Sequence, residues 1–343
     1  MAATTKNSYA ISQWPDSREI LDKLRVLANE LPLYQIKRDS MERYLKYFDV
    51  QCARSREMTD RAKEIIPGGV QHNLAFNYPF PLAIRKAEGA YLWDVDGNRY
   101  IDFLQAGGPT LLGSNYAPVL DQVVELIRES GPVTGLFYEY ELKLAELIRS
   151  HMPSVEMFRM LMSGTEACMA AVRAARTFTS RKYVIKMGGA YHGWSDQFVY
   201  GMRVPGLGAL DAHGIPEGCY QYTQEVFPND LQALAQRMEE NEKEGGTAAV
   251  FLEPLGPESG TRLVLENFNR EVRELCDQYG ALLVFDEVVT GFRVGLGGAQ
   301  GYFGVKPDLT VFGKCVAGGF PGAGGVGGRK DVMLCFAAGI GGP

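Results

Sequence analysis

A lysine and an aspartate that each follow a short apolar run are the residues best placed for chemistry in this sequence. Asp286 ends the apolar run 281–285, and Lys314 follows the run 309–312 and Gly313. Runs this short, and apolar on both sides, are typical of buried parallel strands. Because ligand crevices in open α/β sheets lie at the carboxyl ends of strands, we expect the carboxylate and the amine at one edge of a sheet.

Lys314 has two interpretations. Its neighbours on both sides are apolar or glycine, and lysines are seldom buried without a reason. In the first interpretation it is a loop lysine whose stem crosses apolar surface to reach water. In the second it is a poorly solvated amine that forms a Schiff base, a use for which its easily shifted pKa suits it. The second interpretation indicates pyridoxal phosphate, which needs an imine partner, a carboxylate at its pyridinium nitrogen and a phosphate cradle.

The segment 163–167, Ser-Gly-Thr-Glu-Ala, can supply the phosphate cradle. It follows a predicted strand and opens an alanine-rich helix that we expect to end near Thr179. Ser163 and Glu166 fit a capping box, which many helices have without any ligand. The same helix start would offer a phosphate free N–H groups and a positive dipole end, with Gly164 permitting close approach.

These motifs occur together in a known order. The segments that carry the resemblance are 61–70, 163–167, 191–193, 285–288, 290–294, 297–305 and 313–314. The chain resembles the class III, fold type I, pyridoxal-phosphate-dependent aminotransferases, and within them most of all the glutamate-1-semialdehyde 2,1-aminomutases. The resemblance covers roughly residues 61 to 333.

The resemblance implies catalytic and ring-binding roles for three residues. Lys314 would form the internal aldimine with the cofactor pyridoxal 5'-phosphate and move the proton. Asp286 would pair with the pyridine nitrogen and keep it protonated. For His192 two alternatives stay open, since its ring could touch cofactor or substrate or could hydrogen-bond within the core.

The resemblance also assigns the remaining cofactor contacts. Ser163, Gly164 and Thr165 would hold the phosphate. Tyr191 would stack on one face of the ring and Val288 would pack on the other. A β-branched residue two positions after the strand-end acid is expected to point to the same side of the strand.

Alternating strand and helix patterns predict an α/β fold with a mostly parallel central sheet covered by helices. The resemblance implies fold type I with a smaller second domain, whose C-terminal part is expected beyond Pro343. We expect a helical N-terminal extension over 1–55, a small-domain segment over 56–107 and a large cofactor-binding domain over 108–343. The extension is expected to pack on the body or on a partner subunit.

The amino-acid composition of the chain argues against several kinds of binding partner. The 343 residues carry a net charge of −6 without a basic stripe, which argues against nucleic acid and anionic membranes. Six scattered cysteines indicate a reducing compartment, and with no secretory signal we expect a cytoplasmic protein. Four histidines without ligand spacing argue against a metal site. No apolar run approaches the ~20 residues of a membrane span.

The leading functional hypothesis is an aminotransferase that moves an amino group from a small amine donor to a carbonyl acceptor, as a homodimer. An aminomutase-type isomerase and a non-catalytic subunit of the same fold are the alternatives. The aminomutases place a substrate-gripping arginine where this chain has Ala75, and a related β-amino-acid aminotransferase pattern would place it at His72. Since arginine supplies the best bidentate carboxylate clamp, a less acidic substrate is expected.

Overall fold

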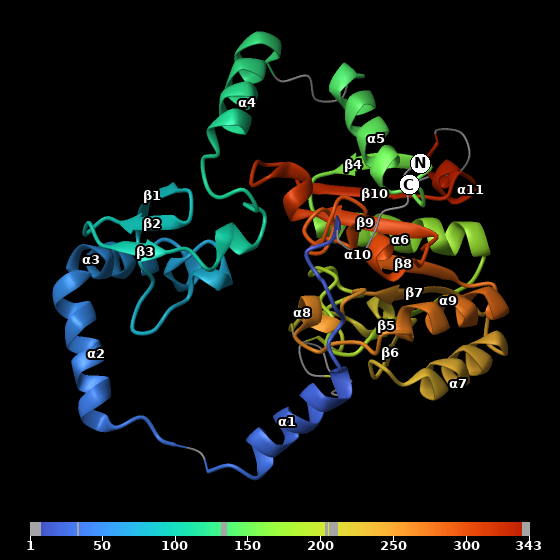
Figure 1. Cartoon of the computed structure of the whole chain (residues 1–343), viewed down its shortest axis with the longest axis horizontal. Coiled ribbons are helices and arrows are strands. Elements are labelled where there is room, and N and C mark those ends of the chain that lie inside the picture. Colours follow the sequence, from blue (N-terminus) through green and yellow to red (C-terminus); the bar gives the residue numbers. More distant parts are fainter. Residues whose placement is uncertain (1–7, 33, 132–135, 203–204, 206–211, 338–343) are drawn as a thin grey trace. The chain divides into compact units, whose positions relative to one another are not determined.

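The computed structural model describes residues 8–32, 34–131, 136–202, 205 and 212–337. The chain divides into two compact units, Leu24–Thr134 and the combination of Met1–Lys23 with Gly135–Pro343. Helix α1 (Ser17–Asn29) contains the point of division (Figure 1). The expected domain boundaries at residues 55 and 107 stay predictions.

The smaller unit combines helices with a three-stranded antiparallel sheet of order β1-β2-β3. The hairpin of the second and third strands lies within the aromatic-rich stretch 91–103. The elements are α2 (Arg38–Gln51), α3 (Ala53–Lys63), β1 (Ile84–Glu88), β2 (Tyr91–Asp94), β3 (Arg99–Ile101) and α4 (Ala117–Ser130).

Asp96, in the turn between β2 and β3, caps the start of α3 from outside the helix. Its Oδ1 accepts the N–H of Arg54 at 2.8 Å, and its Oδ2 accepts the N–H of Ser55 at 3.0 Å and the Ser55 hydroxyl at 2.7 Å. Partial burial raises the pKa of Asp96, but the bonds from Ser55 and Arg54 outweigh it, so the pKa is lowered overall. The carboxylate therefore ties the hairpin to the helix only while it is ionised.

Replacing Asp96 by alanine is expected to lower the free energy of unfolding by about 1 kcal/mol at pH 7, since it removes a helix cap. Because the folded-state pKa lies below the unfolded value, the difference should shrink as the pH falls below about 4. Urea unfolding of D96A and the wild type between pH 3 and pH 7 measures this. D60A is the matched control, because Asp60 forms only an exposed pair with Lys63; an equal loss in both variants at pH 7 would contradict the capping role.

The larger unit contains a seven-stranded sheet of order β4-β10-β9-β8-β7-β5-β6 (Figure 1). The five strands from β9 to β6 pair in parallel, and only β10 runs antiparallel to both of its neighbours. The prediction of a mostly parallel sheet is therefore confirmed. The strands are β4 (Met157–Leu161), β5 (Tyr183–Met187), β6 (Thr223–Val226), β7 (Thr247–Leu252), β8 (Leu282–Asp286), β9 (Leu309–Gly313) and β10 (Gly324–Gly328).

Helices cover both faces of this sheet, because its central strands are apolar on both sides. Helix α6 packs on one face against residues such as Val284, and α7 and α9 pack on the other against residues such as Leu283. Because successive side chains along β8 point to opposite faces of the sheet, Asp286 lies on the same face as Val284, the face that α6 covers. The helices of this unit are α5 (Glu139–His151), α6 (Gly164–Thr179), α7 (Leu231–Glu242), α8 (Pro257–Gly260), α9 (Phe268–Tyr279), α10 (Gly298–Phe303) and α11 (Lys330–Met333).

The second half of the glycine-rich stretch 318–328 forms the fully buried strand β10. A Cβ at Gly324 would collide with the backbone of Ser163, and one at Gly328 with the carbonyl of Asp308. The glycines of β10 therefore allow neighbouring backbone to approach closely, a requirement of packing that the sequence pattern does not display.

Of the expected extension 1–55, the described residues up to Lys23 pack on the body of the larger unit, whereas the residues from Leu24 on belong to the smaller unit. Trp14 is buried and donates from Nε1 to the carbonyl of Val264 at 3.0 Å, and Tyr9 packs edge-on against Tyr302. Across the part of the chain that the structure describes, no helix has the length and apolar character to cross a membrane.

Candidate active site

Three charged side chains lie at the carboxyl ends of neighbouring strands, on the sheet face that α6 covers. Lys186 lies near the end of β5, Glu253 directly follows β7, and Asp286 ends β8. All three are buried. Parallel strands present their carboxyl ends at one edge, which is where open α/β sheets bind ligands. The expected position of Asp286 at this edge is confirmed.

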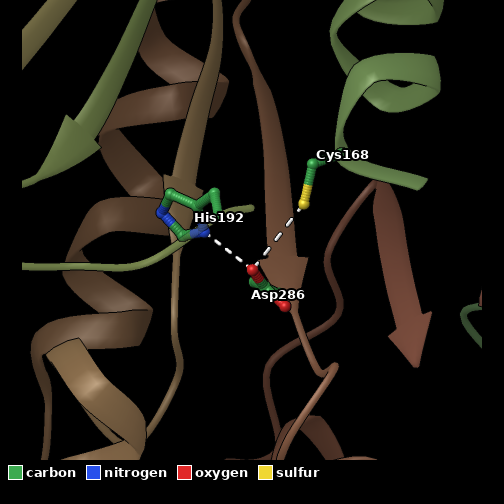
Figure 2. A group of neighbouring side chains, drawn as sticks. All are labelled: Cys168, His192 and Asp286. Atoms are coloured by element: carbon green, nitrogen blue, oxygen red, sulfur yellow. Dashed lines mark hydrogen bonds and ion pairs between the residues drawn. The ribbon is translucent and has the colours of Figure 1, made fainter. Parts of the chain in front are cut away.

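Asp286 is the centre of a hydrogen-bonded group with His192 and Cys168 (Figure 2). Its Oδ2 lies 2.7 Å from Nδ1 of His192 and 3.7 Å from Sγ of Cys168, and its Oδ1 accepts the N–H of Val288 at 3.0 Å. His192 therefore forms a core hydrogen bond, one of its two expected roles, and this bond orients the carboxylate. Nε2 of His192 is buried and has no hydrogen-bond partner among the described residues.

The ligand atoms of Cys168, His192 and Asp286 lie within 4.8 Å of one another, close enough to share a metal ion. Cysteine binds metals as the thiolate. Burial and then the charge of Asp286 raise the pKa of the Cys168 thiol well above its ordinary value. The protonated thiol is a donor to the carboxylate, so we interpret the group as a hydrogen-bonded support for Asp286.

Helix α6 begins as the sequence predicts, with one difference in its cap. The hydroxyl of Ser163 accepts the N–H of Glu166 at 3.2 Å, as in a capping box. The Glu166 carboxylate, however, accepts the N–H of Met162 at 2.7 Å, one residue before the position that the motif predicts. Gly164 and Thr165 lie in the first turn, where backbone N–H groups have no partner within the helix.

Close backbone packing brings the helix start to the other predicted segments. A Cβ at Gly164 would lie 2.9 Å from the Val288 side chain, and one at Gly313 would lie 2.8 Å from it. A Cβ at Gly193 would lie 2.5 Å from Oγ1 of Thr165. The cradle, the segment after Asp286, the residue before Lys314 and the loop of His192 therefore meet at one place.

Lys314 directly follows β9, next to the strand that ends in Asp286. The register pairs Asp286 with Val311, so Lys314 lies three residues beyond that level. Its φ of 44° is in the left-handed region, and its side chain is half-buried. Non-glycine residues in this region cost backbone energy and cluster at functional sites. Burial raises the pKa of the neighbouring Cys315 thiol, although the charges of Arg293 and Lys314 oppose this effect.

Tyr191 is half-exposed, and its backbone N–H donates to Oε1 of Glu253 at 2.9 Å. Burial and the charge of Asp286 raise the pKa of Glu253. Neither Glu253 nor Lys186 was predicted as a site residue from the sequence. A lysine within an apolar strand is the pattern that could have identified Lys186.

The fold is that of an α/β enzyme, and this group of residues lies at the carboxyl edge of its sheet, where such folds bind ligands. The family model of class-III aminotransferases matches residues 74–343, so the chain belongs to that family. It is a pyridoxal-phosphate-dependent enzyme, and the predicted cofactor and fold type I are confirmed.

Individual relatives define the similarity further. The chain is 43% identical over 289 residues to glutamate-1-semialdehyde 2,1-aminomutase 1 of Lachnoclostridium phytofermentans, covering 83% of this chain and 67% of the relative. An omega-transaminase structure from Sphaerobacter thermophilus has a TM-score of 0.79 and 30% identity, covering 87% of this chain and 68% of that one. A β-phenylalanine aminotransferase structure from Variovorax paradoxus has a TM-score of 0.76 and 32% identity, covering 88% and 66%. The chain thus spans about two thirds of the length of these relatives.

The residues at the sheet edge fit pyridoxal phosphate. A ring nitrogen needs a buried carboxylate, and Asp286 is one whose Oδ1 and Oδ2 are both oriented by neighbours. A phosphate needs a helix start that backbone and small side chains leave accessible. Ser163, Gly164 and Thr165 at the start of α6 are all partly exposed, so this helix start is accessible.

Proposed function

We propose that this chain is an aminotransferase that exchanges an amino group between a small amine or amino acid and a carbonyl acceptor. The single observation that supports it best is that Asp286, the start of α6 and the segment leading to Lys314 meet at one edge of the sheet. A non-catalytic subunit would have no need for a buried acid, a glycine-lined helix start and a strand-end amine together.

Each predicted residue has a distinct role in this proposal. When bound, pyridoxal phosphate supplies an aldehyde that condenses with amines and a protonated ring that accepts electrons. Asp286 holds the proton on the ring nitrogen, and Lys314 supplies the amine that anchors the aldehyde and then moves the substrate proton. A lysine at a half-buried position can do both, because its pKa responds to its surroundings.

The remaining predicted residues bind and orient the cofactor. The N–H groups and hydroxyls at the helix start, Ser163, Gly164 and Thr165, hold the phosphate. Tyr191 covers one face of the ring and Val288 the other. Val288 already packs against the helix start and the residue before Lys314, which supports its position beside the ring.

An aminomutase is the second candidate, because the curated relative at 43% identity is one. The absence of arginine from positions 72 and 75 favours the aminotransferase over the aminomutase, since arginine is the best bidentate clamp for the carboxylate of an aminomutase substrate. In this structure Nδ1 of His72 instead accepts the N–H of Leu74 at 3.0 Å within its own turn. We propose a substrate whose carboxylate, if it has one, is bound elsewhere.

A screen of amine donors tests the proposal. The chain loaded with pyridoxal phosphate should show a visible absorbance band of the covalently held cofactor. Apolar amine donors should bleach that band, and pyruvate or 2-oxoglutarate should restore it. Isomerisation of glutamate 1-semialdehyde without any acceptor would favour the aminomutase, and a protein without the band would favour the non-catalytic alternative.

Two further parts of the proposal concern assembly and compartment. We propose a homodimer, for which the shared family with the relatives above is the support. We also propose a cytoplasmic location, because none of the six cysteines, all within the described residues, forms a disulfide. Light scattering would test the homodimer, and a thiol titration in denaturant without reductant would test the absence of disulfides.

A further inference from the structure

A single peptide group, between Ala190 and Tyr191, is held on both sides by charged side chains. Nζ of Lys186 donates to the carbonyl of Ala190 at 2.8 Å. Oε1 of Glu253 accepts the N–H of Tyr191 at 2.9 Å. Lys186 is 0% exposed and Glu253 is 7% exposed; the bond from Lys186 is buried and the bond to Glu253 is partly buried. The negative end of the peptide dipole, the carbonyl, faces the ammonium group of Lys186. The positive end, the N–H, faces the carboxylate of Glu253.

The lysine also joins the two ends of the loop that contains this peptide. Its Nζ donates to the carbonyl of Tyr200 at 2.9 Å, with longer contacts to the carbonyls of Phe198 and Gly201. An ammonium group has three donors, and here they converge on carbonyls from both ends of the segment 190–201. Lys186 therefore fixes the width of the loop as well as the orientation of one peptide.

The glutamate joins the same peptide to a second loop. Its Oε2 accepts the N–H of Ser259 at 2.7 Å, and its Oε1 accepts the N–H of Glu258 at 3.2 Å. Both residues have left-handed φ values, 57° and 54°, which cost backbone energy unless neighbouring groups hold them. Glu253 thus connects the turn at α8 to the backbone of Tyr191.

Charge-assisted hydrogen bonds are short and strong, so a peptide held at both ends cannot rotate without breaking one of them. Buried charges are also costly, and well-packed apolar residues often give equal or better stability. The arrangement is therefore better explained by the geometry it imposes than by the stability it adds. The residues whose geometry it imposes are Tyr191 and, one position later, His192, which bonds to Asp286.

We propose that Lys186 and Glu253 are positioning residues that form a two-sided clamp on the peptide between Ala190 and Tyr191. The clamp fixes the direction in which Tyr191 leaves the backbone and the distance from His192 to Asp286. Its consequence for the reaction rests on the proposed function, in which the Tyr191 ring lies against the cofactor. A clamp that is already in place spares the enzyme the reorganisation of this loop when the cofactor binds.

The test compares K186M, K186Q and E253M with the wild-type chain. Methionine approximates the length of either side chain without its charge, and glutamine keeps a donor for one carbonyl. The first readout is the circular dichroism of the cofactor's visible absorbance band, divided by the amount of cofactor bound. This quantity reports how asymmetric the surroundings of the cofactor are. The second is amide hydrogen exchange of the segment 187–201 without cofactor. L234A is the control for general destabilisation, because Leu234 is fully buried in α7 on the opposite face of the sheet.

K186M should lose about half or more of the dichroism and bind pyridoxal phosphate about tenfold more weakly, since small misplacements at a site have large effects. Exchange of 187–201 should quicken about tenfold. K186Q should recover part of each change. The double variant K186M/E253M should do little more than the stronger single variant, because both residues hold one peptide and their effects are not additive.

L234A should lower Tm while leaving the dichroism per bound cofactor and the exchange of 187–201 unchanged. Wild-type dichroism and exchange in K186M, or equal changes in L234A, would overturn the clamp. If K186M does not fold, K186Q and E253M decide the outcome by the same two readouts. A wild-type chain that binds no cofactor would defeat the proposed function instead, and the exchange measurement would still decide the clamp.

Discussion

Replacing Lys314 by alanine is expected to abolish the absorbance band of the covalently held cofactor and to lower kcat by about 10³-fold or more. An alanine can neither anchor the aldehyde nor move the substrate proton, and positioned acid–base groups alone contribute about 10²–10⁴ in rate. Spectra of the purified variant with added pyridoxal phosphate, together with single-turnover rates, measure both effects. The fold should be unaffected, because the side chain is only half-buried.

The control for this substitution is K306A. Lys306 is an exposed lysine in the loop before β9, at the opposite end of that strand from Lys314. K306A should keep the band and the rate of the wild type. An unchanged band in K314A would remove Lys314 from the cofactor site, and the proposed function with it.

Replacing Asp286 by asparagine is expected to retain the cofactor but to lower kcat by about 10²–10³-fold, the typical cost of losing one oriented electrostatic contact in a site. Asparagine keeps an acceptor for the N–H of Val288 and a partner for His192, but it lacks the charge that holds a proton on the ring nitrogen. Rates measured with saturating cofactor separate this effect from weaker binding. The absorbance of the bound cofactor should also change its pH dependence.

The matched control is D277N. Asp277 is an exposed acid in α9 whose carboxylate pairs with Arg273 at 2.8 Å, on the sheet face opposite to Asp286. Its loss should leave kcat within about twofold, since exposed ion pairs contribute little. A D286N variant as active as D277N would show that the acid at the end of β8 does not act on the ring.

The sequence predicted the parallel part of the sheet well, because buried parallel strands are continuous apolar runs that end on polar residues. The strands that deliver Asp286 and Lys314 were expected within one residue of their observed bounds. Strand β10 was missed for a physical reason: glycine has no strand preference, and its place here is required by neighbouring backbone. Close packing of this kind cannot be recognised from the segment's own residues.

The predicted site residues all lie in the larger unit, and the structure brings their segments together, whereas their individual roles stay predictions. The structure adds Lys186 and Glu253, whose partners are backbone atoms. A sequence gives only the side chains and their spacing. The hydrogen bond from Lys186 to the backbone carbonyl of Ala190 therefore cannot be recognised from it. Likewise, the shift of the Glu166 bond from Ser163 to Met162 depends on the exact approach of β4 to the helix.

Strand β10 lies between β4, which leads to Ser163, and β9, which leads to Lys314. It separates the two by two strand spacings, about 10 Å. Four of its five residues lack side chains, so peptide hydrogen bonds alone set that width. In the proposed function, in which Ser163 holds the phosphate and Lys314 anchors the aldehyde, the backbone would therefore set the distance between these two groups, and substitutions elsewhere would change substrate preference without changing that distance.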